Sequence, residues 1–385
     1  MDDILNKQHK RRVVVTGMGC VSPIGCSPQE LFNNLLKGNN NFTLHRGVMI
    51  SLVSDSFDRK CYEWGLQKYT KVESYALSAI KDAIAYSGID LVKENTLGLC
   101  VGTSQNLSDS KAKSGDVLST IIHEIGFGGE CIALPVACSG GNAAIAVAMS
   151  KIQSGNTDIF LAGGVEAYTD LCFSTFNVLQ ILSNTGCRPF TAHRDGITIG
   201  EGAGFLVLEE LEHAIARKAP ILGEIVSYSI RCDSTHLNTP DVNGVSACLA
   251  MREAISRAQI ECSDIGYISP HGTGTITNDL QEMNAIYAVF GELSNKVPIS
   301  AIKSMLGHCM GAASAIEAIA AVQSLLLQQI PETIGIKEGE IDSNFPFTPN
   351  LCNFNLKSFN YILSNSFAFG GNIACIILKR INYES

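Results

Sequence analysis

One cysteine lies where the sequence predicts a strand to turn into a helix, a place suited to nucleophilic chemistry. Cys138 follows the apolar run Leu134-Pro-Val-Ala and precedes Ser139-Gly-Gly-Asn and an alanine-rich stretch. Alanine has the highest helix propensity, so a helix is expected to begin just after the cysteine. The free N–H groups and positive dipole end of a helix start favour thiolate, the nucleophilic form. The alternative is a buried structural cysteine, because free cysteine is among the most buried residue types.

Two histidines also occupy glycine-containing turns. His271 ends the apolar run Ile268-Ser-Pro and opens a Gly-Thr-Gly-Thr turn, and His308 follows Lys303-Ser-Met-Leu-Gly. The other histidines, His236 among them, have polar or helical-surface surroundings and are interpreted as solvated. A nucleophilic cysteine with two imidazoles permits covalent catalysis, in which an imidazole activates the thiol or donates hydrogen bonds to an oxyanion.

Composition favours an intracellular enzyme. The chain has 385 residues, long enough for two domains or a duplicated one, with 46% hydrophobic and 17% charged residues. A net charge of −9 argues against broad nucleic-acid binding. The 14 cysteines are scattered without zinc spacing, and we expect reduced thiols and no metal. No signal-peptide core or membrane-spanning run is apparent, so cytoplasmic localisation without a membrane partner is expected.

An internal repeat organises the chain. The pattern Ala76-x-x-Ala-Ile-Lys-Asp-Ala-Ile returns 171 residues later as Ala247-x-x-Ala-Met-Arg-Glu-Ala-Ile. The same offset carries Cys138 onto Cys309, beside His308. The repeat predicts two similar α/β halves, and packing about a pseudo-twofold axis would bring the turns at Cys138 and His308 together.

The charged helix predicted at 209–218 gives a boundary between the halves. We expect residues 1–215 to carry the cysteine and residues 216–385 to carry the two histidines. Alternating strands and helices indicate a layered α/β fold with mainly parallel sheets. A dinucleotide fingerprint beginning at Gly17 is not favoured, because Ser22 replaces its third glycine. The polar segment 38–60 gives no clear secondary-structure prediction.

Nine segments, in order along nearly the whole chain, resemble the β-ketoacyl-[acyl carrier protein] synthases, and most closely the type II elongating members. The resemblance implies a thiolase-like α/β fold with two similar halves in a layered αβαβα arrangement. The matching segments are Arg11–Gly19, Ala137–Ser139, Ala162–Glu166, Arg188–Phe190, Gly200–Gly204, His271–Thr275, Lys303–His308, Gly311–Ala313 and Asn365–Gly371.

The resemblance implies a role for each residue of the catalytic set. Cys138 would hold an acyl chain as a thioester, and His271 and His308 would hold the malonyl carbonyl and assist decarboxylation. The resulting enolate would attack the acyl group in a Claisen condensation that adds two carbons. The N–H groups of Cys138 and Phe369 would form the oxyanion hole, and the Phe369 side chain would gate the acyl pocket.

Further residues match supporting positions of the family. Thr273 and Thr275 would line the phosphopantetheine arm of the carrier protein. Lys303, Asp279 and Glu317 would form a charged network, for which a helix-capping or interdomain ion pair is the alternative. No metal or organic cofactor is implied, since the phosphopantetheine belongs to the carrier.

The implied partners are an acyl carrier protein and a second synthase subunit, identical or related. Because carriers are acidic, docking needs local basic residues, and the resemblance places Lys68 and Lys71 there, with Arg59 and Lys60 nearby. Ordinary solvated lysines are the alternative. No nucleic-acid partner is expected.

Two departures from the usual family pattern leave the substrate open. Ala368 replaces a glycine beside the gate, and Asn372 follows Gly371 directly where Thr-Asn is usual. The first hypothesis is an enzyme that elongates a fatty-acid or polyketide chain. The second is that the chain is the catalytic subunit of a specialised polyketide or polyene synthase. A non-catalytic chain-length partner and a thiolytic or hydrolytic enzyme are further alternatives, and the Cys-His-His set argues against both.

Overall fold

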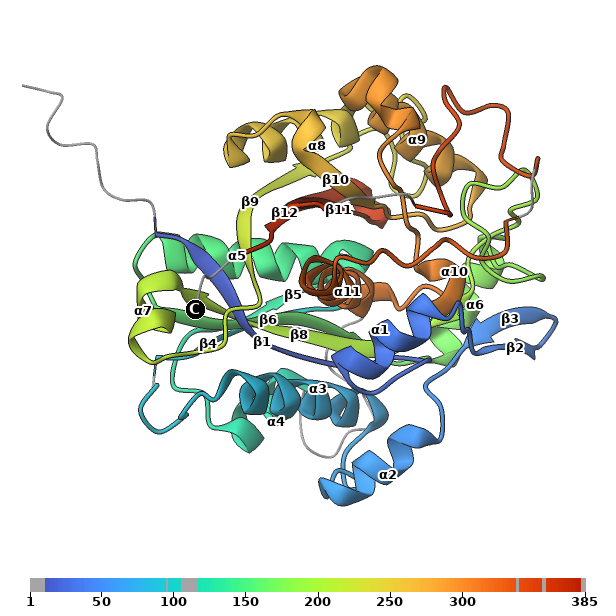
Figure 1. Cartoon of the computed structure of the whole chain (residues 1–385). Helices are drawn as coiled ribbons and strands as arrows, with labels where there is room; N and C mark the ends of the chain where they lie inside the picture. The colour runs from blue at the N-terminus through green and yellow to red at the C-terminus, as the bar shows by residue number, and fades with distance from the viewer. Residues whose placement is uncertain (1–10, 95, 105–116, 337–338, 355–357, 382–385) are drawn as a thin grey trace, which may run out of the picture.

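Five layers of helix and sheet are visible in the computed structural model, which describes residues 11–94, 96–104, 117–336, 339–354 and 358–381 (Figure 1). Two outer helix layers enclose two sheet layers, and a central layer of helices lies between the sheets. The predicted αβαβα arrangement is thereby confirmed. The outer helices are α3 (Lys71–Ser87) and α4 (Val117–Ile125) on one side and α8 (Val245–Ala258) and α9 (Ile276–Phe290) on the other, and the central ones include α5 (Gly140–Gln153) and α11 (Ala313–Leu327).

Both sheet layers belong to one continuous nine-stranded sheet. Its order is β10-β11-β12-β9-β1-β8-β6-β4-β5, and the antiparallel pair β1–β9 joins the halves through the register Val13↔Ile225 to Val15↔Gly223. The strands are β1 (Val13–Val21), β4 (Gly98–Gly102), β5 (Cys131–Leu134), β6 (Ile159–Glu166), β8 (Gly202–Glu210), β9 (Gly223–Cys232), β10 (Ile265–Ser269), β11 (Tyr361–Phe367) and β12 (Asn372–Lys379).

The expectation of mainly parallel sheets is wrong. Among the described strands of this sheet, five of the eight neighbouring pairs are antiparallel. The last strand of each half causes this: β8 inserts between β6 and β1, and β12 inserts between β11 and β9, each antiparallel to both neighbours. Alternation of strands and helices along the chain does not reveal such an insertion.

The internal repeat is confirmed by the order of elements in the two halves. Helix α3 and strand β4 in the first half correspond to α8 and β10 in the second. The 3-10 turns η1 (Ala137–Ser139) and η4 (Met310–Ala312) lead into α5 and α11, and both open on a left-handed residue, Ala137 (φ 51°) or Met310 (φ 46°). The structural equivalent of Cys138 is therefore Gly311, not Cys309.

The unassigned segment 38–60 forms a hairpin and a helix. Strands β2 (Phe42–His45) and β3 (Val48–Ser51) are joined by Arg46 and Gly47, which both have positive φ, and β3 pairs with β7 (Ile199–Gly200). This two-residue turn suits the twist of a hairpin, but Arg at its first position hides it from sequence rules. The remaining helices are α1 (Pro28–Leu36), α2 (Ser56–Glu63), α6 (Asp170–Val178), α7 (Leu211–Ala216) and α10 (Lys303–Leu306), and the remaining 3-10 turns are η2 (Cys262–Asp264), η3 (Gly291–Asn295) and η5 (Phe369–Gly371).

Helix α11 is the central helix of the molecule. The stretch Met310–Leu327, which contains it, is long and apolar enough to cross a bilayer, but 89% of it is buried inside the protein. It packs against both layers of the nine-stranded sheet and against α5. Its apolar composition is therefore that of a core helix.

Candidate active site

Glycine packing brings the two repeated turns together at the ends of β4 and β6. A Cβ at Gly102 would lie 2.2 Å from the backbone carbon of Gly140, and a Cβ at Gly164 would lie 2.1 Å from the carbonyl oxygen of Gly311. Such distances are far inside van der Waals contact, so only glycine permits this approach of backbones. The starts of α5 and α11 consequently meet, as the pseudo-twofold arrangement predicts.

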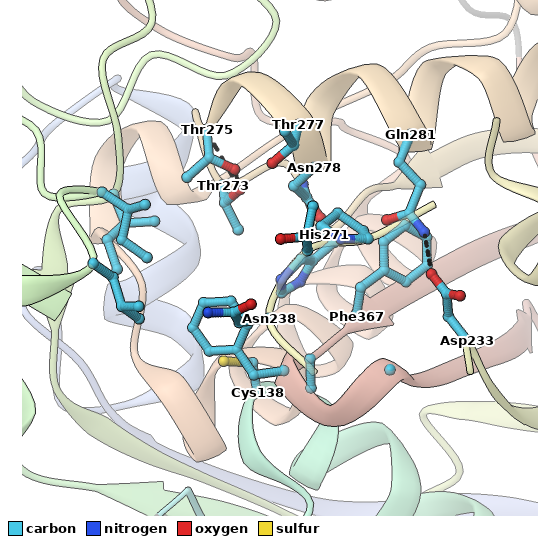
Figure 2. A pocket seen from close by; sticks show the side chains of 18 of the residues that line it. Cys138, Asp233, Asn238, His271, Thr273, Thr275, Thr277, Asn278, Gln281 and Phe367 are labelled. Atoms are coloured by element: carbon cyan, nitrogen blue, oxygen red, sulfur yellow. Dashed lines mark hydrogen bonds between the residues drawn. The ribbon is translucent and has the colours of Figure 1, made fainter. Parts of the chain in front are cut away.

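A cavity of about 280 Å³ opens above the Cys138 turn. Figure 2 shows Cys138 at its floor, His271 above it and the threonine side chains along one wall. Six residues singled out from the sequence line this one cavity: Cys138, His271, Thr273, Thr275, His308 and Phe369. Several others line it without having been predicted from the sequence: Phe176, Asp233, His236, Asn238, Asn278, Gln281 and Phe367.

Cys138 is a buried thiol, only 6% exposed. Burial raises its pKa to about 12, and the nearby Lys303 ammonium opposes that rise only in part. Desolvation thus opposes the thiolate form that the helix start is expected to favour.

The imidazoles of His271 and His308 are neutral. Their ring centroids are 5.3 Å apart and the rings are nearly perpendicular, at 80°. Burial, reinforced by the Lys303 charge, holds the pKa of both His271 and His308 well below the ordinary range. The N–H of Met310 donates to His308 Nδ1 at 3.2 Å, so the proton of the neutral ring is on Nε2. His308 thus offers a hydrogen-bond donor without carrying a charge.

Glu282 on α9 fixes the His271 turn and was missed by sequence reasoning. Its two carboxylate oxygens accept the N–H groups of His271 and Gly272, each at 2.8 Å. The Asn365 amide donates to the same carboxylate at 3.2 Å, and burial raises the pKa of Glu282 to about 7. The three-residue spacing from Asp279 puts both carboxylates on one helix face, a pattern that could have identified Glu282.

The expected charged network divides into two separate clusters. Lys303 and Glu317 form a buried ion pair between α10 and α11. Asp279 instead accepts the N–H groups of Phe190 and Gly274 and lies 3.7 Å from Arg194. The reason is position: Asp279 lies in the first turn of α9, where its carboxylate accepts N–H groups of the threonine turn and of Phe190.

The gate segment is tied to the loop after β9. The N–H of Gly370 donates to the carbonyl of Leu237 and the N–H of Asp233 donates to that of Gly371, both at 2.7 Å. The Phe369 ring, 38% exposed, stacks against Phe176 with centroids 6.1 Å apart. This loop brings His236 to the cavity, where its side chain remains exposed, as its polar sequence surroundings predict.

Two of the basic residues proposed for carrier docking already have internal partners. Lys71 Nζ lies 2.7 Å from Oε1 of Glu201, a carboxylate with no exposed surface, and Lys60 pairs with Asp82. Lys68 is more available: its side chain is 65% exposed and lies 3.6 Å from Glu124. Arg59 is exposed on α2.

Within the described part of the chain, no group of three or more His, Cys, Asp or Glu side chains has the arrangement of a metal site. The cavity presents a thiol, imidazoles, hydroxyls and amides. These groups suit acyl chemistry at a thioester.

Comparisons with known proteins agree with this chemistry. The sequence models "Beta-ketoacyl synthase, N-terminal domain" and "Beta-ketoacyl synthase, C-terminal domain" match residues 10–214 and 222–337. The chain is 33% identical to 3-oxoacyl-[acyl-carrier-protein] synthase 2 of Vibrio cholerae serotype O1, covering 97% of this chain and all of the relative. It is 31% identical to nodulation protein E of Rhizobium meliloti strain 1021, over 96% of this chain and all of that protein.

Solved structures give the same result. The ishigamide ketosynthase/chain length factor superposes with a TM-score of 0.88 at 30% identity, covering 97% of this chain and 100% of the other. A type II polyketide ketosynthase solved with its acyl-carrier protein and bound to the hexaketide gives 0.83 at 27% identity, over the same shares. The chain belongs to the beta-ketoacyl synthase family of condensing enzymes, which are acyltransferases.

Proposed function

We propose that this protein joins a malonyl unit, delivered by an acyl carrier protein, to an acyl chain held on Cys138, lengthening that chain by two carbons. One observation carries the proposal: a buried thiol and two neutral imidazoles line a single cavity. A Claisen condensation needs a nucleophile that holds the acyl group and donors that hold an enolate, and this set supplies both.

The first half-reaction is acyl transfer to Cys138. The cysteine sulfur forms a bond to the acyl carbon, the bond from that carbon to the carrier sulfur breaks, and the cysteine proton ends on the carrier thiol. Because burial keeps Cys138 protonated at rest, an imidazole of the cavity relays this proton. The N–H groups of Cys138 and Phe369 would stabilise the tetrahedral oxyanion.

The second half-reaction is decarboxylation and carbon–carbon bond formation. The malonyl carboxylate leaves as CO₂, and its bonding electrons form an enolate on the thioester. The Nε2–H of His308, with His271 beside it, donates to that enolate oxygen. The enolate carbon then attacks the acyl carbon, the bond from that carbon to the Cys138 sulfur breaks, and the resulting thiolate takes up one proton from solvent.

The remaining assignments complete the proposal. Thr273 and Thr275 would contact the phosphopantetheine arm, and Lys68 would meet the carrier, with Lys71 in a mainly structural role. We divide the chain after residue 215, in the last turn of α7 (Leu211–Ala216) and before β9. All fourteen cysteines are unpaired thiols, which supports work in the reducing cytoplasm. No cofactor beyond the carrier's own arm is required.

A second candidate is the catalytic subunit of a specialised polyketide or polyene synthase. The likeness to the ishigamide ketosynthase/chain length factor favours it, as do Ala368 and Asn372 at the gate. The thiol and both imidazoles lie in the cavity, which argues against a non-catalytic chain-length role for this chain.

The test is a condensation assay with purified protein, malonyl-carrier and a series of acyl-carriers, alone and with candidate partner chains. The proposal predicts release of CO₂ and carrier-bound products two carbons longer than the donor. Condensation only with unsaturated donors or only with a partner chain would select the second candidate. Absence of elongation from every donor and partner would contradict both.

A further inference from the structure

The turn that carries Thr273 and Thr275 is held from outside. It joins β10 to α9, and both of its glycines have positive φ, 43° at Gly272 and 76° at Gly274. The side chain of Thr275, the N-cap residue of α9, makes no capping hydrogen bond. The two threonine hydroxyls are instead hydrogen-bonded to each other at 2.9 Å, and neighbouring segments hold the backbone that carries them.

Arg194 supplies that support from the other half of the molecule. Its side chain is only 3% exposed, and its guanidinium donates to the carbonyls of Thr275 at 3.4 Å and Ile276 at 3.3 Å. It also donates to the Thr191 carbonyl at 2.7 Å and to Asp342 at 2.6 Å. The planar fork of arginine allows one side chain to reach all these acceptors.

The position of the Arg194 guanidinium beside the start of α9 does not stabilise that helix, so its role lies elsewhere. A cation beside a helix N-terminus opposes the helix dipole, yet Arg194 lies at the start of α9. Asp279 in the first turn of α9, 3.7 Å from the guanidinium, and Asp342 balance the charge. The guanidinium is therefore paired where it is buried, and its remaining donors are directed at the backbone of the turn.

Asp279, which lies beside the Arg194 guanidinium, adds hydrogen bonds to the threonine turn itself. One carboxylate oxygen accepts the N–H of Gly274 at 3.2 Å and the other accepts the N–H of Phe190 at 2.9 Å. The N–H of Gly196 donates to the Gly274 carbonyl at 3.0 Å, and the Cys187 thiol donates to the Thr273 carbonyl at 3.1 Å. Segment 187–196 of the first half thus holds the threonine turn of the second.

We propose that Arg194 is a positioning residue for the carrier arm: it sets the Thr273 and Thr275 hydroxyls at the spacing that the pantetheine amides meet. Arg194 does not line the cavity, so it acts through the threonines and not on substrate. The inference rests on the proposed function, because it assumes that a pantetheine arm occupies this wall. It predicts an effect on donors that carry the arm and none on donors that lack it.

The test compares two acyl donors in Cys138 acylation, followed by intact-protein mass. One donor is the acyl-carrier, and the other is a simple alkyl thioester of the same acid, which lacks the pantetheine amides. Arg194→Lys keeps the charge but loses the fork. We expect its KM for acyl-carrier to rise about tenfold with kcat changed less than about twofold, and its kinetics with the alkyl thioester to be unchanged. Arg257→Lys, on the exposed face of α8, is the matched control.

A double-mutant cycle separates positioning from general stabilisation. If Arg194 acts through Thr273, adding Arg194→Lys to Thr273→Ala raises the KM little beyond either single variant. If Arg194→Lys does not fold, Asp342→Asn loosens the same guanidinium and should raise the KM about threefold.

Three outcomes would overturn the inference. Equal losses with both donors would show a general structural role, and fully additive effects with Thr273→Ala would show independent action. If the wild-type protein is acylated by the alkyl thioester but by no acyl-carrier, the pantetheine arm does not bind along the wall that carries the threonines. Wild-type protein that is acylated by neither donor would instead contradict the proposed function.

Discussion

The two repeated turns of this protein share a backbone plan but differ in chemistry. Each opens on a left-handed residue, passes through a 3-10 turn and enters a helix of small residues. The first turn presents the thiol of Cys138, where the second has Gly311. The second half instead carries His308 just before its turn. Duplication therefore supplies the geometry, and the chemistry lies at positions where the copies differ.

The contacts of the two turns show how they stay in register. The N–H of Asn142 on α5 donates to the Ser314 hydroxyl on α11 at 2.9 Å, and that hydroxyl lies 3.5 Å from the Cys138 carbonyl. Glu166 accepts the N–H of Gly311 at 3.2 Å and that of Ser104 at 2.7 Å. Each helix start is thus tied to a residue outside its own half or its own turn.

The largest expected effect separates the roles of the turns. His308→Ala should lower condensation about 10²- to 10⁴-fold, because the enolate loses a hydrogen-bond donor, while acyl transfer to Cys138 persists at a reduced rate. Acylation is followed by intact mass and condensation by product analysis. His123→Ala, on the exposed face of α4, is the control. Normal condensation by His308→Ala would contradict the assignment of acyl transfer to the first turn and of enolate stabilisation to the second.

The buried pair below the histidines should dominate stability. Lys303→Met leaves Glu317 without its counter-ion and should cost about 3 kcal/mol of unfolding free energy at pH 8. The cost should shrink at pH 6, because burial raises the pKa of Glu317 to about 7 and the side chain can then take up a proton. The exposed pair provides the control: Arg257→Met should cost less than about 1 kcal/mol. Equal costs in denaturant titrations would contradict this account.

A pH-dependent effect should follow from the carboxyl that ties the turns together. Burial raises the pKa of Glu166 to about 7, from an ordinary value of 4.5. The folded protein then retains a proton that the unfolded chain releases, so this group's contribution to stability is present below pH 4.5 and is lost as pH rises through 7. Glu166→Gln should flatten the fall in unfolding free energy across this window by up to about 1.4 kcal/mol per pH unit. If the slope of unfolding free energy against pH, measured by denaturant titrations, is unchanged in Glu166→Gln, a group other than Glu166 causes the pH dependence.

The smallest effects concern the surface lysines. Lys68→Glu should raise the KM for acyl-carrier about threefold and leave an alkyl thioester unaffected, because rim charges act mainly on association. Lys71→Met should instead lower the melting temperature, since it leaves Glu201 buried without its cation. A lower melting temperature for Lys68→Glu, together with a purely kinetic effect for Lys71→Met, would reverse these roles.

The repeat and its two turns could be predicted from the pattern of small-residue helices after glycine turns, and the layers and the two threonines from the family resemblance. Other residues of the cavity, such as Asn238 and Gln281, could not be predicted. Strand direction could not: β8 and β12 insert antiparallel, and no local pattern encodes that. The hairpin at Arg46-Gly47 was missed because a left-handed arginine resembles no common turn.

The sequence also does not reveal the surroundings of residues whose partners are distant along the chain. His236 reaches the cavity only because its loop packs on the Gly370 segment, and Lys71 pairs with a carboxylate 130 residues away. The helix start favours a thiolate, but burial, a tertiary property that the sequence does not display, raises the Cys138 pKa. Sequence motifs thus predicted which residues meet in the cavity better than the surroundings that set their protonation.

The most direct test of the central claim is the intact mass of wild type and Cys138→Ala after incubation with acyl-carriers, followed by malonyl-carrier. The account predicts an acyl adduct on wild type alone, which disappears on addition of malonyl-carrier as a product two carbons longer forms. An acyl adduct on Cys138→Ala, or elongation by that variant at the wild-type rate, would contradict it.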